Sequence, residues 1–370
     1  MAIVELFDWW RLLINPEKAE WRKKIESLLL GTKPFSCFLM IFLPTTFMGG
    51  LQKGLTMKAI MALRLPISLM PCFAAGCLFG FNRKALTSLF EDAVRISSQI
   101  CTDGVPPRIE ENSRRLLNFT RIGYGAMHAW TAIATLSVPV SVAFQGKLLI
   151  DMWPWFDGDV GVWLGGTLQT VIVYPMAFPV YAFSVYMWSV VEALAVLFNI
   201  ISNQLTHAST YSQVHQVVRM HAQVLSLSAR VAQQIEVVLT VLTIGILMTP
   251  ALSMLMVIRG FFDLFSAASI PFLVAFWILC RAGQILESAA LHLMSSSMVT
   301  FSNVQEVNDA NEKSKTCRLL LVIMMQAMRK QSITAFRGNM RYNLHTCLEA
   351  FRSWYSILQY LLNMPDNNSV

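Results

Sequence analysis

The segment 163–204 reads WLGGTLQTVIVYPMAFPVYAFSVYMWSVVEALAVLFNIISNQ, and its last part, from Glu192 to Gln204, contains neither proline nor glycine. A single helix over this segment would be roughly 60 Å long at about 1.5 Å per residue, about twice the hydrocarbon thickness of a bilayer. The segment therefore predicts a membrane-spanning helix that continues well beyond the membrane.

Six further apolar runs have the length of membrane spans. In chain order the seven predicted spans are Phe35–Leu51, Leu63–Phe81, Ile122–Phe144, Trp163–Val185, Val237–Ile258, Ile270–Leu293 and Tyr342–Leu362. The composition agrees, because 55% of the residues are hydrophobic and only 14% are charged, unlike an ordinary soluble domain. We predict an all-α membrane protein with seven transmembrane helices.

The 29 Lys and Arg residues are unevenly distributed among the segments outside the spans. Twenty-two precede the first span or lie in every second loop, four lie in the opposite segments, and Arg64, Arg281 and Arg352 lie within spans. By the positive-inside rule, the N-terminus is cytosolic and the C-terminus is outside. The net charge of +7 then reflects topology, and no nucleic-acid partner is predicted, because no patch interleaves basic and aromatic residues.

Several predicted helices extend into the cytosol. Apolar residues recur at helical spacing in Val214–Val237, and the apolar run Cys317–Met328 is too short to cross a bilayer. We therefore expect helices 4, 5 and 6 and a split helix 7 to form a cytosolic anchor. Its apolar faces need a partner, which is either the same region of neighbouring subunits or the rest of one monomer.

These boundaries divide the chain into three parts. Residues 1–34 form a cytosolic amphipathic segment, in which Trp9, Trp10 and Trp21 are expected at the inner headgroup layer. Residues 35–315 hold helices 1–6 with their cytosolic extensions. Residues 316–370 hold the split final helix, with a cytosolic half at 316–330 and a membrane half at 341–363.

No enzyme is predicted, with no catalytic residue, metal ligand or cofactor. The six His residues are dispersed without metal-ligand spacing, and neither a phosphate-binding glycine loop nor a nucleophile elbow is present. We expect no structural disulfide, because five of the seven Cys lie in spans and Cys101 and Cys317 lie on the reducing side.

The carboxy-terminal 50 residues resemble the insect odorant receptor family. The family's signature appears as SITAF at 332–336, NLHT at 343–346 and YSILQYLL at 355–362. WPWFD at 153–157 and GQILES at 283–288 are also similar to the family. The sequence departs from the pattern where Cys347 replaces an aromatic residue and where the proline before the Thr-Ala turn is absent.

The resemblance implies an odour-tuned subunit, because the chain lacks the long insertion between spans four and five of the shared co-receptor. Such subunits are expected to form a heterotetramer with the odorant co-receptor in the plasma membrane of sensory neuron dendrites. The assembly would be a non-selective cation channel that odorant opens directly, with no G protein required.

A ligand pocket is expected where the outer halves of spans two, three, four and six converge. An apolar, aromatic-rich cavity there would suit a small volatile of low polarity. Ordinary helix packing is the alternative for each residue taken singly. The candidates are Leu69, Phe73, Trp130, Ala134, Val138, Ile172, Tyr174, Met176, Phe178, Phe272 and Phe276.

The resemblance places the pore on the final helix, with Tyr360, Leu361 and Met364 at the constriction. A hydrophobic ring there would gate by dewetting. The alternative for Tyr360 is an interfacial aromatic anchor. Glu349 and Arg352 either line a water-filled path, meet a neighbouring subunit, or pair with each other at helical spacing.

Other membrane protein classes fit less well. A gustatory receptor channel of the same superfamily is the nearest alternative, since Tyr355–Tyr360 partly matches that group's final-helix ending. A G-protein-coupled receptor would have an external N-terminus and an Asn-Pro-x-x-Tyr motif, and the last span contains none. A secondary transporter would show internal repeats, and we find none.

Overall fold

The computed structural model describes residues 1–16, 24–25, 27, 57–102, 104–146, 148, 158–258, 270–304, 310–328, 333–335 and 339–363. The prediction of an all-α protein is confirmed, apart from one two-stranded hairpin. In chain order the elements are α1 (Ala2–Ile14), α4 (Met57–Phe81), α5 (Arg83–Cys101), α6 (Pro107–Gln145), α7 (Gly158–His207), α8 (Tyr211–Ile258), α10 (Ile270–Val304), α11 (Ala310–Met328), β1 (Thr334–Ala335), β2 (Met340–Arg341) and α12 (Leu344–Leu362).

Four helices in the described part of the chain are long and apolar enough to cross a membrane. They are Pro107–Phe144, Ala177–His207, Tyr211–Leu255 and Leu273–Ser302. They contain predicted span three, most of spans five and six, and the last nine residues of span four, whereas Met70–Phe81, in predicted span two, is shorter. The first predicted span lies outside the described residues. The count of seven spans and the orientation remain predictions.

The long helix α7 forms the centre of the bundle. In its most apolar stretch 72% of the residues are buried, against 22% in α6. The outer surface of α6 instead exposes large apolar side chains, among them Ile133, Leu136 and Phe144. An apolar outer face is what a helix in contact with lipid requires, because no water is present there to solvate polar groups.

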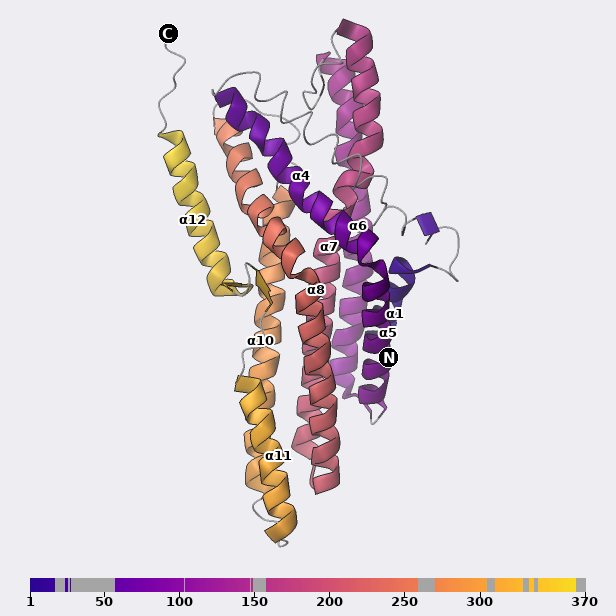
Figure 1. Ribbon diagram of the computed structural model, residues 1–370, viewed down its shortest axis with the longest axis vertical. Coiled ribbons are helices and arrows are strands. Elements are labelled where there is room, and N and C mark those ends of the chain that lie inside the picture. Colours follow the sequence, from indigo (N-terminus) through magenta and orange to yellow (C-terminus); the bar gives the residue numbers. More distant parts are fainter. Residues whose placement is uncertain are drawn as a thin grey trace.

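Helices α7 and α8 are each much longer than one bilayer thickness, as the sequence predicts for these two segments. They contain 50 and 48 residues, and only residues 208–210 separate them. At the same end of the molecule α11 packs along α10, whereas α12 stands at the opposite side of the hairpin (Figure 1).

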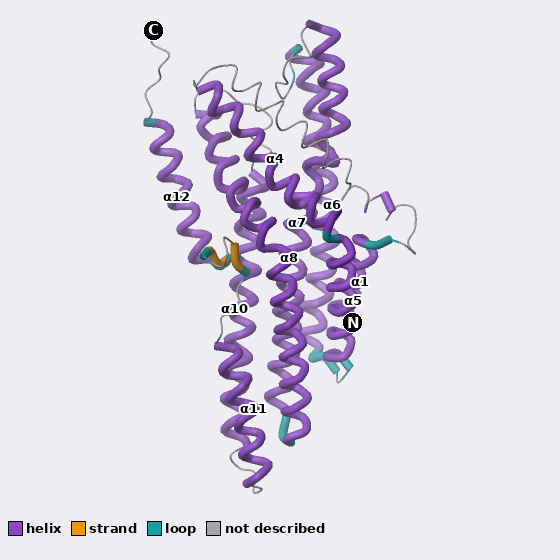
Figure 2. The backbone as a smooth tube through the Cα atoms, viewed as in Figure 1, coloured by secondary structure: helices purple, strands orange, loops and turns teal. Residues whose placement is uncertain are grey.

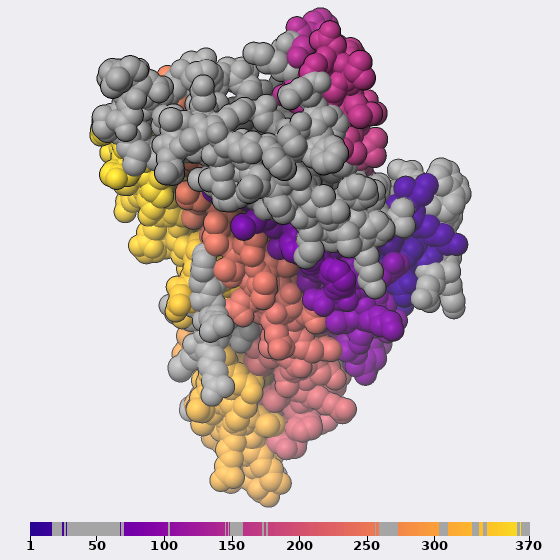
Figure 3. Space-filling view, turned by 45° about the horizontal axis from the view of Figure 1, so that its top comes forward, coloured from indigo at the N-terminus to yellow at the C-terminus, as the bar shows by residue number. Residues whose placement is uncertain are grey.

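The hairpin separates α11 from the final helix α12 (Figure 2). Its two strands pair antiparallel, with Thr334 opposite Arg341, and the amide of Tyr342 extends the pairing by donating to the carbonyl of Ile333 at 2.9 Å. Helix α12 begins directly afterwards, where the Asn343 side chain caps it by accepting from the Thr346 amide at 2.9 Å. On one face of the molecule α8 lies in the middle (Figure 3). Helices α11 and α12 flank it on one side, and α4 and α5 flank it on the other.

The amino-terminal helix α1 is buried against α5, α6 and α7 and does not place Trp10 at the headgroup layer as the sequence predicts. The Trp10 side chain is fully buried, and its Nε1 donates to Oγ of Ser189 in α7 at 2.9 Å. Its ring packs edge-on against Tyr124 and Tyr186. The apolar face of α1 therefore finds its partner inside the chain. Trp21 lies outside the described residues.

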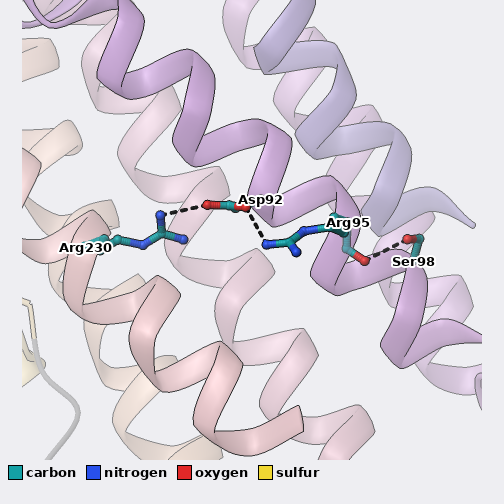
Figure 4. Close-up of polar contacts among 4 residues, drawn as sticks. All are labelled: Asp92, Arg95, Ser98 and Arg230. Atoms are coloured by element: carbon teal, nitrogen blue, oxygen red, sulfur yellow. Dashed lines mark hydrogen bonds and ion pairs between the residues drawn. The ribbon is translucent and has the colours of Figure 1, made fainter. Parts of the chain in front are cut away.

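A charged contact holds α5 to α8. Asp92 of α5 accepts from Arg230 of α8 at 2.8 Å and from Arg95, one turn along α5, at 2.6 Å (Figure 4). The Asp92 side chain is 27% exposed, so it is only partly screened by solvent. The contact fixes the helix that follows α4 against the extended part of α8.

Candidate functional site

A cavity of about 420 Å³ lies between α6, α7 and α10. Helices α6 and α7 each contribute residues at positions i, i+3, i+4 and i+7, the spacing that brings side chains to one helix face. The lining residues are Gly123, Ala126, Met127, Trp130, Tyr181, Ser184, Val185, Trp188, Val274, Ala275 and Ile278. The volume is in the range of small-molecule sites.

The cavity wall is almost wholly apolar, and its few polar groups are mostly already engaged. Oγ of Ser184 donates to the carbonyl of Val180 at 3.0 Å, and Nε1 of Trp188 donates to Oε1 of Glu192 at 2.7 Å. Nε1 of Trp130 is buried and makes no hydrogen bond of ordinary geometry among the described residues, although it lies near the hydroxyl of Tyr181, another residue of the wall. The cavity therefore combines apolar burial with one N–H donor that can serve a bound molecule.

A charged pair lies one turn below this wall. Glu192 of α7, which holds the Trp188 indole, interacts electrostatically with Arg281 of α10. The Arg281 guanidinium also lies over the ring of Trp277, 5.9 Å from its centroid. The hydrogen bond to Glu192 fixes the rotamer of Trp188 at the edge of the cavity.

An aromatic cluster continues from the cavity along α6 and α7. His128 stacks on Phe178 with ring centroids 4.1 Å apart, and its Nδ1 lies 2.6 Å from the hydroxyl of Tyr174. Tyr124 packs edge-on against both His128 and Phe178. Two predicted ligand residues, Tyr174 and Phe178, thus belong to a cluster that packs the two helices together.

Among the predicted ligand residues whose side chains the structure describes, only Trp130 lines the cavity. Val138 is fully buried, Ala134 and Phe73 are half-buried, and none of the three lines the cavity. Phe276 faces the other side of α10 and packs against Tyr342 and Phe351. The side chains of Leu69, Ile172, Met176 and Phe272 lie outside the described residues.

The predicted gate residues lie at the end of α12. Tyr360 is 67% exposed, Leu361 belongs to α12 although its side chain is outside the described residues, and Met364 is outside them altogether. Glu349 is exposed and its Oε2 lies 3.6 Å from Nδ1 of His345, and no ion pair joins it to Arg352 in the described part of the chain. Arg352 is exposed as well.

The sequence analysis did not predict the cavity residues Gly123–Met127 of α6 and Tyr181–Trp188 of α7. The predicted positions lie about one to three turns further toward the C-terminus of α6 than Gly123–Met127 and further toward the N-terminus of α7 than Tyr181–Trp188. The shared i, i+3, i+4, i+7 spacing is the signal that could have found them, but the same spacing also describes any buried helix face.

Comparisons with known proteins identify the fold. No family model matches the chain, and no curated protein matches it. The structure of the insect olfactory receptor OR5 from Machilis hrabei is similar with a TM-score of 0.75 and 13% identity, over 94% of this chain and 91% of that one. OR5 in complex with eugenol is similar with a TM-score of 0.69 and 13% identity, over 97% of both chains. The chain therefore has the fold of the insect olfactory receptors.

Proposed function

We propose that this chain is an odour-tuned insect odorant receptor, a subunit of a cation channel that opens when a small volatile binds. The observation that carries the proposal is the fold shared with OR5 over nearly the whole chain. The carboxy-terminal motifs in residues 332–362 support it independently, because they were matched to the family from the sequence alone.

The proposed ligand site is the cavity between α6, α7 and α10. A volume of about 420 Å³ with an apolar wall favours burial of one small ring compound, and the buried N–H of Trp130 favours a ligand with one acceptor oxygen. OR5 was solved with eugenol, which is a small oxygenated aromatic compound. We infer the same chemical class for this chain.

The proposed pore helix is α12, in a heterotetramer with the odorant co-receptor and with the C-terminus outside the cell. Exposed apolar and aromatic side chains along α12, among them Leu348, Tyr355 and Tyr360, support a helix that faces other subunits or a pore. Direct gating requires only that ligand binds the open arrangement better than the closed one.

The test is to record currents from cells that express the chain with and without the co-receptor while applying eugenol and related benzenoid volatiles. Outside-out patches without added nucleotide should respond. A response that strictly requires GTP would contradict direct gating. An epitope after Val370 should be reached by antibody on intact cells, and a requirement for permeabilisation would contradict the orientation.

A matched pair of substitutions tests the cavity itself. Ala126→Phe adds a ring at the cavity wall and should abolish the response, because the added volume takes the place of the ligand. Ala129→Phe adds the same ring to an exposed position of α6 that does not line the cavity, and it should leave the response intact. Equal responses from the two variants would exclude this cavity as the ligand site.

A further inference from the structure

Helix α10 presents two opposite faces to two different parts of the molecule. Val274, Ala275 and Ile278 line the cavity, whereas Phe276, Cys280 and Gly283 face the start of α12. At about 100° per residue, the mean directions of these two sets differ by roughly 160°. A ligand that displaces α10 from the cavity side therefore acts on the contact with α12.

Antiparallel packing fixes the register of the contact between α10 and α12. Phe276 lies against Phe351 with ring centroids 6.2 Å apart, and one turn further the Cys280 thiol is within hydrogen-bonding reach of the Cys347 thiol. Another turn along, Gly283 lies against the backbone of Tyr342. The contact thus ends at the residue that precedes the N-cap of α12.

The absence of a side chain at position 283 allows this close approach. A Cβ on Gly283 would overlap the carbonyl oxygen of Tyr342 and stand 3.0 Å from its carbonyl carbon. The obstacle would be backbone, which cannot rotate away as a flexible side chain would. Gly283 therefore forms a contact site on α10, here called the seat, against which the backbone at the start of α12 packs.

The Tyr342 side chain connects the same point to α8. It is 1% exposed, and its hydroxyl is hydrogen-bonded to Oγ1 of Thr243 and lies 3.3 Å from the carbonyl oxygen of Leu239. Its ring also packs edge-on against Phe276, with centroids 5.9 Å apart. Tyr342 is thus held by α8 through its hydroxyl and by α10 through its ring and backbone.

We propose that Tyr342, seated on Gly283, is the positioning residue that transmits a ligand-induced shift of α10 to the base of α12. The inference deepens the proposed function and rests on it. Tyr342 is about one helix width from the cavity-lining face of α10 and does not line the cavity itself. It acts on the coupling of binding to opening and not on the intrinsic affinity of the cavity, which is measured on the purified chain without the co-receptor.

Tyr342→Phe removes the hydroxyl and keeps the ring. The fold should tolerate it, because Oγ1 of Thr243 already donates to the carbonyl of Leu239 at 2.7 Å and keeps that partner. The purified receptor is titrated with eugenol by quenching of tryptophan fluorescence, and maximal eugenol-evoked current per surface receptor is recorded with the co-receptor. We expect an unchanged Kd and a maximal current reduced about five-fold, the scale of one lost hydrogen bond. Tyr355→Phe, which alters an exposed tyrosine of α12, should leave both values unchanged.

Gly283→Ala tests the seat. It should reduce the maximal current at least as much as Tyr342→Phe, again with Kd unchanged. Gly125→Ala is the matched control, since a Cβ there meets no atom within 4 Å. A thermal scan of both variants without ligand tests the contact between Gly283 and the backbone of Tyr342. Only Gly283→Ala should lower the unfolding temperature.

The outcomes separate the two proposals. If wild type and Tyr342→Phe give currents of the same size, Tyr342 does not transmit the shift of α10 to α12. The proposed function would stay intact. A Kd that rises in parallel with the loss of current would overturn this role of Tyr342 too, because Tyr342 would then act on the cavity. A wild-type assembly that never conducts would overturn the proposed function and the role of Tyr342 with it.

Discussion

Oδ2 of Asp92 accepts a hydrogen bond from Nη1 of Arg230 at 2.8 Å, across 138 residues of sequence. The guanidinium of Arg230 is the main reason why the pKa of Asp92 lies below its ordinary value, and Arg95 adds to this effect while partial burial opposes it. The pair therefore stabilises the α5–α8 contact wherever Asp92 is ionised.

The stabilisation by Asp92 should depend on pH. A lowered pKa in the folded state contributes stability above the pKa of the unfolded chain, about 3.9, and this contribution is lost as the pH falls through the lowered value. Asp92→Asn should thus lower the unfolding temperature by roughly 1 to 3 °C at pH 7. Thermal scans of the detergent-solubilised receptor from pH 7 to pH 3 should show this difference shrinking below about pH 4.

A surface pair serves as the control for that series. Glu111 and Arg115 of α6 lie 2.6 Å apart but are 62% and 67% exposed, so Glu111→Gln should change the unfolding temperature little. A difference between wild type and Asp92→Asn that stayed constant down to pH 3 would contradict the role given to Arg230.

Trp130→Phe should distinguish ligands by their polarity. The substitution keeps an aromatic ring and removes the buried N–H. Binding of eugenol should weaken about five-fold, because one hydrogen bond is lost, whereas a hydrocarbon of the same shape should bind as before. Fluorescence titration of both compounds checks this.

The control for Trp130 is Trp277→Phe, at a 46% exposed position outside the cavity wall. It should leave the affinity for both compounds unchanged. An equal loss for eugenol and for the hydrocarbon in Trp130→Phe would show that the indole contributes shape and not a hydrogen bond.

Trp10→Ala should destabilise the receptor by roughly 3 to 5 kcal/mol, because it leaves a large cavity among α1, α5, α6 and α7. The substitution also removes the indole N–H that donates a hydrogen bond to the hydroxyl of Ser189. Surface expression and thermal unfolding measure the effect. Trp163→Ala, at a 56% exposed position, should be tolerated far better, and equal damage from the two substitutions would contradict the buried position of α1.

Cys280 and Cys347 should form a disulfide on treatment of membranes with molecular iodine. Both thiols are free and buried, and they lie within hydrogen-bonding reach. The two thiols lose two electrons and two protons, and iodine is reduced to two iodide ions. Peptide mass spectrometry should find the linked pair in wild type and not in Cys347→Ser, while Cys317→Ser should still form it. Linkage of Cys280 to any other cysteine would contradict the α10–α12 register.

The sequence by itself determined the helical class, the long extensions of α7 and α8 and the separation of α11 from α12. These features depend on local composition and on apolar periods, which one segment carries without its neighbours. The resemblance to odorant receptors likewise depended on contiguous motifs near the C-terminus, and it predicted the fold that the comparison with OR5 found.

Only the tertiary structure decided which helix faces meet. The apolar face of α1 could equally have covered lipid, and the choice to bury Trp10 depends on Ser189, which is 179 residues away. The cavity wall and the seat of Tyr342 on Gly283 arise in the same way, because each needs residues of separate helices at one depth. Periodicity fixes which residues share a face but not the rotation or the relative height of two packed helices, so it found Trp130 and missed Tyr342.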